Sequence, residues 1–353
     1  MRQYTNNSGI RLQYTDAVWF AFLPCIIKVS GGSTSRVELE VTDGEGTTLN
    51  YAVDAFKASC VVDYREYAQS FFDGIVDASM DYTKEVTYSS TGKELTVGVK
   101  VYQDSGTLVM NYRFTTFFVW GAIRQGETWN GYKRLTYFRN YPFSFGLYPT
   151  SDVKILVSHD DMPNKYVELA GGRIVNVNGS LIPKGARHST IYLFWGTIEQ
   201  ATFDNHFDLT FSKASGTQQE LMRIDISDAD KGTYLRWIDR HGFLRYWLFT
   251  EGDEKRTISS GGQFIRDNLT DYPSGRRQSY EREDEVSLCA PLVDRDTFDF
   301  LQDLASSPVV ERFLGGDSWE PVTIKAGSYT KTTAELQDFV CNLVINNTNI
   351  QSL

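Results

Sequence analysis

Four histidines are the residues of this chain best suited to acid–base or metal chemistry, and their spacing does not form a local site. They are dispersed as His159, His188, His206 and His241, with no HxH, HExxH or HxxxH pattern. Metal-binding motifs usually place two ligands within a few residues of each other, so a metal site would have to be assembled from long-range contacts. His159 follows the apolar run 153–157 and precedes Asp160 and Asp161, which are good turn formers. We therefore interpret this segment as a turn after a strand and not as a catalytic centre.

Acidic residues offer two further kinds of chemistry. The DxxDxD cluster Asp225, Asp228 and Asp230 carries oxygen ligands of the type that calcium prefers, but it lacks the glycine and the terminal glutamate of an EF-hand loop. Because it follows the run 221–226, a polar strand end is the favoured interpretation. A glycoside hydrolase needs only two carboxylates at a suitable separation, and sequence cannot rank the 45 Asp and Glu residues of this chain. No GxSxG, P-loop or GxGxxG motif is present, which removes the common hydrolase and nucleotide-binding signatures.

The segment 232–251, GTYLRWIDRHGFLRYWLFTE, is the most informative part of the chain. Two aromatic-rich runs flank Asp-Arg-His-Gly, which predicts a β-hairpin with His241 in its turn. Large aromatic side chains provide both core burial and interface contacts. The candidates for packing or for contact with a neighbour are Trp237, Arg240, Phe243, Tyr246 and Trp247. The arginines of the hairpin are expected to form ion pairs with acidic neighbours, and they are Arg236, Arg240 and Arg245.

Composition narrows the class of protein. The chain has 353 residues and a formal net charge of −10, without a long Lys/Arg run, so nucleic acid is not an expected partner. Aromatic content is 14%, which favours a β-rich assembly or binding protein. The four cysteines contain no CxxC and are expected to be buried free thiols, typical of a protein made in a reducing cytosol. The apolar run 17–27 contains Pro24 and is too short to span a bilayer, so neither a membrane span nor a signal peptide is expected.

Strand patterns dominate the rest of the chain. In ELTVGVKVY, residues 94–102, every second side chain is apolar, and the turn 103–106 then leads into a second strand over 107–119. The runs 36–41 and 47–53 predict another hairpin around the turn 43–46. Helices are predicted at only two places, after a capping-box-like sequence at 63–66 and over residues 295–305.

The predicted fold is mainly β, with two antiparallel β-sandwich or barrel-like domains and a few short helices. The polar, turn-rich stretch 207–219 marks the predicted boundary, so residues 1–218 form an N-terminal β-rich region and residues 219–353 form a C-terminal β domain. Two polar stretches inside the C-terminal domain, 250–263 and 268–285, are predicted to be loops. The second contains Arg276, Arg277 and the mixed-charge run 281–285, expected to be solvated or to face a partner.

The WIDRHGF sequence at residues 237–243 resembles an element of tailed-bacteriophage structural proteins, in which a strand, a W/L-N/D-R-x-G turn and an aromatic strand open a C-terminal β domain. The following segments are similar in outline: a variable loop near 276–285, a short helix near 298–304, and strands over 322–324 and 336–345. The resemblance covers about the last 130 residues, and the histidine inside the turn departs from the expected pattern.

The resemblance implies a virion component of the tail, baseplate or neck that is made in the bacterial host cytoplasm and has no enzymatic activity. Its implied partners are copies of itself in a ring and other virion proteins, without a cofactor. Ring-forming proteins need large apolar faces and extended hairpins that join a neighbour's sheet. Two alternatives remain open: a carbohydrate-binding β module that recognises a surface glycan or receptor, and a glycoside hydrolase with dispersed carboxylates.

Overall fold

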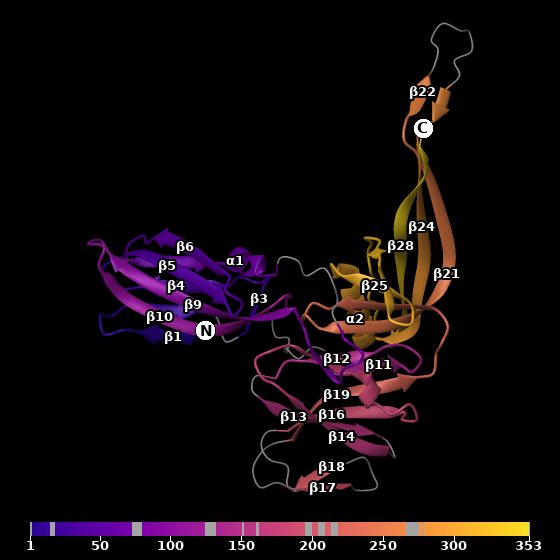
Figure 1. Ribbon diagram of the computed structural model, residues 1–353, viewed down its shortest axis with the longest axis horizontal. Coiled ribbons are helices and arrows are strands. Elements are labelled where there is room, and N and C mark those ends of the chain that lie inside the picture. Colours follow the sequence, from indigo (N-terminus) through magenta and orange to yellow (C-terminus); the bar gives the residue numbers. More distant parts are fainter. Residues whose placement is uncertain are drawn as a thin grey trace. The chain divides into compact units, whose positions relative to one another are not determined.

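The chain is mainly β, as predicted from the sequence, and its structure is a computed structural model (Figure 1). The structure describes residues 2–14, 18–72, 80–123, 132–149, 152–159, 162–194, 200–203, 209–212, 218–265, 275–277 and 279–352. Two compact units are present. The first comprises Met1–Tyr137, Pro142–Ser227 and Asp239–Arg245, and the second comprises Phe138–Tyr141, Asp228–Ile238 and Tyr246–Leu353.

The sequence predicts a single boundary after residue 218, whereas each unit in the structure is made of three separate segments of the chain. Strand β19 (Gln218–Ser227) pairs with β16 (His188–Phe194) and so belongs to the first unit. The turn of the aromatic hairpin also belongs to the first unit, while most of its two strands belong to the second. Segments distant in sequence therefore share one unit because strand pairing and core packing, and not chain order, decide which residues fold together.

The N-terminal part of the first unit is a β-sandwich. One sheet contains β1 (Arg2–Thr5), β2 (Arg11–Tyr14), β4 (Ile26–Ser30) and β7 (Ser59–Asp63). The other contains β3 (Val18–Phe20), β10 (Leu108–Val119), β9 (Gly92–Gln103), β5 (Thr34–Asp43) and β6 (Thr48–Asp54). Side chains of both sheets form a common core, to which β9 contributes Leu95, Val97, Val99 and Val101, as its alternation predicts. All pairings here are antiparallel except β3 with β10, which is parallel.

Helix α1 (Arg65–Ser70) lies at the predicted place, but its predicted capping box does not form. The N-cap is Tyr64, whose side chain makes no capping hydrogen bond. The Asp63 carboxylate accepts hydrogen bonds from the backbone N–H groups of Arg65 and Cys25. The carboxylate therefore connects the start of the helix to the backbone of Cys25, directly before β4.

The remainder of the first unit contains further sheets. A five-stranded sheet has the order β11 (Arg134–Phe138), β19, β16, β13 (Val153–His159) and β14 (Met162–Leu169). A three-stranded sheet contains β12 (Ser144–Leu147), β15 (Val175–Asn178) and β8 (Val86–Tyr88), and β15 leads into the short 3-10 helix Gly179–Leu181. The strands β17 (Gln200–Phe203) and β18 (Leu209–Ser212) form a hairpin.

The second unit is built on a seven-stranded sheet. Its order is β26 (Ser318–Pro321), β25 (Val310–Gly315), β20 (Thr233–Ile238), β21 (Leu244–Ser260), β24 (Ser279–Asp294), β28 (Leu336–Ser352) and β27 (Thr323–Ile324). Helix α2 (Arg295–Ser306) confirms the helix predicted at 295–305. It begins at the Asp294 side chain, which accepts a hydrogen bond from the Thr297 N–H, and it buries Phe298, Leu301 and Leu304.

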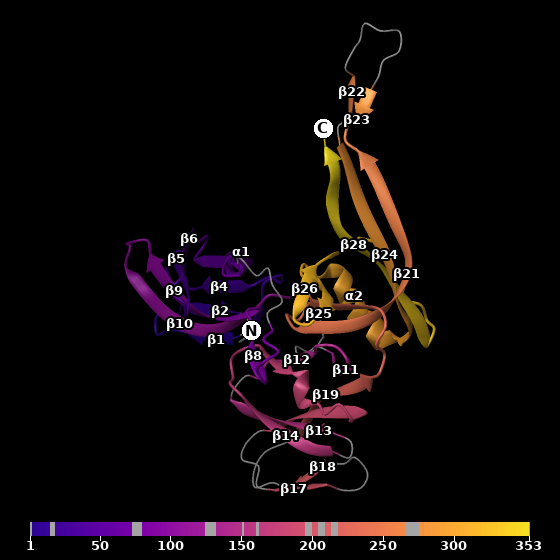
Figure 2. The ribbon, with the colours of Figure 1, turned by 45° about the vertical axis from the view of Figure 1, so that its right-hand side comes forward.

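The far ends of β21, β24 and β28 form an extension of this sheet that we call the arm, residues 254–260, 279–286 and 343–352. In Figures 1 and 2 the arm continues well past α2 and β25 of the same unit. All residues of β21 from Thr250 to Ser260 are exposed. The short hairpin of β22 (Gln263–Ile265) and β23 (Gly275–Arg277) follows β21 at the end of the arm.

The two loops predicted at 250–263 and 268–285 are therefore largely wrong. Residues 250–260 and 279–285 are strands, and Arg276 and Arg277 lie on β23. The run TEGDEKRTISS places polar residues on both faces of β21, so it lacks the alternation that marks a half-buried strand. Backbone pairing with β24 makes it a strand nonetheless, with Arg256 opposite Asp284 and Thr257 opposite Glu283.

Candidate functional site

The turn of the aromatic hairpin is organised by one carboxylate, that of Asp239. Its Oδ1 accepts hydrogen bonds from the backbone N–H groups of His241 and Phe243, both at 2.9 Å. Its Oδ2 accepts one from Arg245 Nε at 2.6 Å, and His241 Nδ1 lies 3.5 Å from the same oxygen. Gly242, with φ +81°, completes the turn in a conformation that favours glycine. The Asp239, His241 and Arg245 side chains form what we call the Asp239 cluster.

The Asp239 cluster is completely buried. Burial by itself raises the pKa of Asp239, but the charge of Arg245 and the hydrogen bond from His241 outweigh it and hold the pKa well below its ordinary value. The guanidinium of Arg245 also lies over the Phe243 ring, 5.1 Å from its centroid. Both oxygens of the Asp239 carboxylate accept hydrogen bonds from residues of the hairpin. The carboxylate therefore stabilises the conformation of the turn.

The backbone around this turn is closely packed within the first unit. The Arg240 carbonyl accepts a hydrogen bond from the Ala122 N–H at 2.6 Å, and Thr91 Oγ1 donates to the Gly242 carbonyl, also at 2.6 Å. A Cβ on Gly121 would lie 2.3 Å from the Arg240 carbonyl oxygen, so only glycine fits there. The predicted turn residue His241 is thus a packed structural residue.

The five aromatic-hairpin candidates are placed mainly in cores. In the second unit, Trp237 is fully buried against Phe300 of α2, with ring centroids 5.2 Å apart. Tyr246 is buried and stacks with Tyr234, and Trp247 is half-buried.

The other two candidates belong to the first unit. Phe243 is buried in a cluster with Phe20, Phe117, Val119 and Ile174. The guanidinium of Arg240 lies 5.7 Å from the centroid of the Tyr132 ring.

The predicted acidic partners are seen for Arg245 and Arg236. Arg245 pairs with Asp239, and Arg236 Nε binds Glu311 Oε2 at 2.6 Å inside the second unit. The guanidinium of Arg236 also lies 4.1 Å from the centroid of the Trp319 ring. These contacts join the hairpin strand β20 to β25 and β26 and stabilise the sheet.

The remaining histidines occupy separate places, and His206, Asp160 and Asp161 lie outside the described residues. His159 is buried at the end of β13, where Nδ1 lies 3.1 Å from Ser189 Oγ. Burial and the charge of Lys165 lower the pKa of His159 to about 4, so the ring is neutral at pH 7. Ser189 is also buried, and its Oγ donates to the Ser158 carbonyl, so this pair has the contacts of a structural interaction.

In the acidic cluster Asp225, Asp228 and Asp230, the first two carboxylates bind basic side chains, and the Asp230 carbonyl accepts a hydrogen bond from the Tyr141 hydroxyl. The Asp225 carboxylate contacts Arg134, Arg223 and His188, and although burial raises its pKa, the two arginines bring the pKa below its ordinary value. Asp228 pairs separately with Arg139 at 2.9 Å, in the second unit. In the part of the chain that the structure describes, no group of three or more His, Cys, Asp or Glu side chains is arranged to hold a metal ion.

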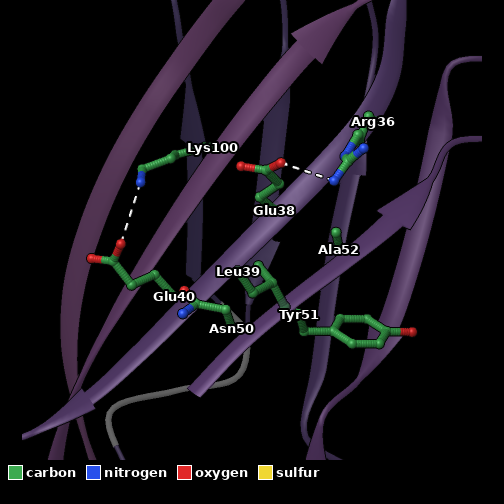
Figure 3. Close-up of a pocket in the computed structure, with 8 residues that line it drawn as sticks. All are labelled: Arg36, Glu38, Leu39, Glu40, Asn50, Tyr51, Ala52 and Lys100. Carbon is green, nitrogen blue, oxygen red and sulfur yellow. Dashed lines mark hydrogen bonds and ion pairs between the residues drawn. The ribbon is translucent and has the colours of Figure 1, made fainter. Parts of the chain in front are cut away.

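A shallow hollow of about 260 Å³ lies on the outer side of β5, β6 and β9 (Figure 3). Its charged residues are ion-paired: Arg36 with Glu38 at 3.1 Å, and Lys100 with Glu40 at 3.3 Å. The ring of Tyr51 points away from these charges in Figure 3 and lies 5.0 Å from Tyr67, between ring centroids.

Besides Lys100, a second basic residue binds Glu40, and it does not line the hollow. Arg113 of β10 lies 2.8 Å from Glu40 Oε1, across Gly98 of β9, which has no side chain to block it. Glu40 is therefore held by bases of β9 and β10, whereas Glu38 pairs with Arg36 of its own strand, β5.

In comparisons with known proteins, no protein-family model matches the sequence, and no curated protein matches it. Within the described residues, no helix is both long enough and apolar enough to cross a membrane.

Sequence reasoning missed the two surfaces that the fold exposes most. One is the arm, whose strand β21 carries polar residues on both faces. The other is a pair of exposed apolar sites at Phe56 and Leu292, which lie at turns and bulges without the glycine or asparagine that usually marks them. The sequence signal for the arm is the mixed-charge run 281–285, which we interpret as a solvated or partner-facing segment.

Proposed function

We propose that this protein is a non-enzymatic structural protein that assembles with copies of itself, as a tail, baseplate or neck component of a tailed phage or phage-like particle. The observation that carries the assembly part of the proposal is the arm. The particle is proposed from the resemblance of residues 237–243 and the domain that follows them.

The three strands that form the arm are longer than the strands of an ordinary self-contained sheet. β21 has 17 residues, β24 has 16 and β28 has 17, against roughly 5–6 in a common globular strand. Within the described residues, the part of β21 that lies in the arm pairs only with β24. The part of β28 beyond Val344 also pairs only with β24. Long strands with free backbone groups at both edges are suited to pairing with another chain.

The aromatic hairpin supports the same proposal in a different way. Trp237 and Tyr246 are buried in the second unit, so they stabilise the base from which the arm extends. The buried ion pairs of Arg245 and Arg236 hold the turn and the sheet in place. A rigid base with an exposed arm is the arrangement that a scaffold protein needs, and it requires no cofactor.

The proposal is tested by the mass of the purified protein in solution. Size-exclusion chromatography with light scattering, over a hundredfold range of concentration, should give a mass that is a multiple of the chain's 40.1 kDa. Electron micrographs of the same sample should show closed rings. A protein that stays monomeric at all concentrations, and shows no particles, would contradict the proposal.

A second candidate function is glycan recognition at the hollow of Figure 3, favoured by its convergent polar groups Glu38, Asn50 and Lys100. Saccharide hydroxyls bind such carboxylate, amide and ammonium groups. A glycan array probed with the full chain tests it: retention that is lost in Asn50→Ala, with the monomeric state unchanged, would favour this function over assembly.

A further inference from the structure

Backbone strain in the described chain is confined to two small surfaces. Apart from glycines, only Lys57, Ala58 and Leu292 have a clearly positive φ there, at 50°, 55° and 51°. Residues with a side chain are disfavoured in this left-handed region because Cβ approaches the backbone, and such strain often marks functional sites. The two most exposed large hydrophobic side chains of the described residues are Phe56 and Leu292, at the same two places.

The first surface is the Phe56 turn, residues 56–59. Phe56 and Ser59 exchange both of their backbone hydrogen bonds, at 2.9 and 3.0 Å, so Lys57 and Ala58 form a two-residue turn between the two sheets of the sandwich. Such turns usually contain Asn-Gly, which adopts positive φ without cost. Here the tight turn holds the Phe56 side chain 75% exposed, with the Lys57 ammonium 5.3 Å from its ring centroid.

The second surface is the Leu292 patch, formed by Leu292, Leu336, Val340 and Asp338. Leu292 lies at a bulge between β24 and β28, and its N–H donates to Asp338 Oδ1 at 2.9 Å. Leu336, Asp338 and Val340 follow one another on the outer face of β28. The three aliphatic side chains beside Asp338 are 69%, 52% and 51% exposed, so the patch is apolar around one carboxylate.

The charges of the two surfaces are complementary. Lys57 and Asp338 are both exposed, and neither forms an ion pair with another described residue. The Phe56 turn presents an aromatic ring beside the Lys57 cation, and the Leu292 patch presents aliphatic side chains around the Asp338 anion. The two surfaces are therefore complementary in both apolar character and charge. Apolar contact would supply affinity, and the opposite charges would fix orientation.

We propose that the Phe56 turn of one copy binds the Leu292 patch of a second copy, with the Phe56 ring on Leu292 and Val340 and the Lys57 ammonium on Asp338. This inference rests on the proposed function, because it names a contact, in addition to the arm, through which copies assemble. The two surfaces are different, so the contact is heterologous: each copy offers one turn and one patch, and repetition gives a closed ring or a filament.

The test measures self-association by sedimentation velocity over a dilution series of the full chain. Phe56→Ser and Leu292→Ser should each weaken the association constant about 30-fold, the effect of losing a hot-spot side chain. The matched controls are Val61→Ser and Leu314→Ser, which remove similarly exposed apolar side chains outside both surfaces and outside the arm, and they should leave the constant unchanged.

A charge exchange tests the pairing directly without altering the core. Lys57→Glu alone and Asp338→Lys alone should each weaken association by about tenfold or more, and the double variant should recover most of the loss. Asp338→Asn keeps an oxygen acceptor for the Leu292 N–H, so its effect isolates the charge. Lack of recovery in the double variant would overturn the proposed pairing.

Leu292→Gly separates a binding role from a structural one. Glycine relieves the strain at φ 51°, so the melting temperature should stay the same or rise while association weakens. Wild-type protein that is monomeric throughout would refute the proposed function itself. Wild-type protein that assembles, with association unaffected by Phe56→Ser and Leu292→Ser, would refute only this interface.

Discussion

Asp239 and Arg245 form an ion pair whose two side chains are completely excluded from solvent, with 2.6 Å between Oδ2 and Nε. The same carboxylate also accepts hydrogen bonds from the backbone N–H groups of His241 and Phe243, so it binds three other residues of the aromatic hairpin. The hairpin turn is thus defined by a polar contact, although its sequence is dominated by aromatic residues.

Replacing Asp239 with Asn should leave the Arg245 guanidinium buried without its counter-charge. We expect the free energy of unfolding to fall by about 3–5 kcal/mol, as when one partner of a buried ion pair is removed. Urea denaturation followed by tryptophan fluorescence measures it. Asp228→Asn is the matched control, since Asp228 also binds an arginine but is largely exposed, and its loss should stay below about 1 kcal/mol. Equal losses in the two variants would show that the buried pair has no special role.

His159 should make stability depend on pH. Its folded-state pKa is lowered to about 4, against about 6.5 in an unfolded chain. Between these values the unfolded chain binds a proton that the folded chain does not, so the free energy of unfolding should rise with pH from 4 to 6.5 and level off above, by on the order of 3 kcal/mol in total. His159→Gln keeps a polar partner for Ser189 and should flatten this part of the profile. An unchanged slope in the variant would assign the dependence to other groups.

Gly121 should not tolerate a side chain. Alanine there would place Cβ 2.3 Å from the Arg240 carbonyl oxygen, a backbone atom that cannot move aside on its own. We expect Gly121→Ala to cost about 1–3 kcal/mol, as overpacked sites do. Gly44→Ala is the control, because a Cβ on Gly44 meets open space, and its effect should lie within about 0.5 kcal/mol. Thermal unfolding of the two variants gives the comparison.

The two tryptophans of the hairpin should differ in their contribution to folding. Trp237 is fully buried against Phe300, so Trp237→Ala should cost about 3–5 kcal/mol. Trp247 is half-buried and contacts the edge of Phe138, so Trp247→Ala should cost roughly half as much in proportion to the area it buries. Chemical denaturation of each variant decides this. A larger loss for Trp247 would contradict this dependence on buried area.

Much of the fold could be predicted because local patterns there coincide with tertiary burial. The alternation of residues 95–101 predicted a strand with one buried face, and Leu95, Val97, Val99 and Val101 are all in the sandwich core. The spacing of Phe298 and Leu301 predicted α2 because a helix on a sheet must bury one side. The arm could not be found in this way, since β21 is exposed on both faces beyond Phe249 and no burial pattern marks it.

The sequence by itself determined the fold class, the hairpin of residues 232–251 and the expectation that its arginines bind acidic groups. Only the tertiary structure decided which of the 45 acidic residues they bind, because Asp239 is six residues from Arg245 whereas Glu311 is 75 residues from Arg236. It also decided that Lys57, Ala58 and Leu292 take left-handed backbone conformations. Their residue types do not favour that region, so its cost is met by hydrogen bonds from distant segments, which no local pattern contains.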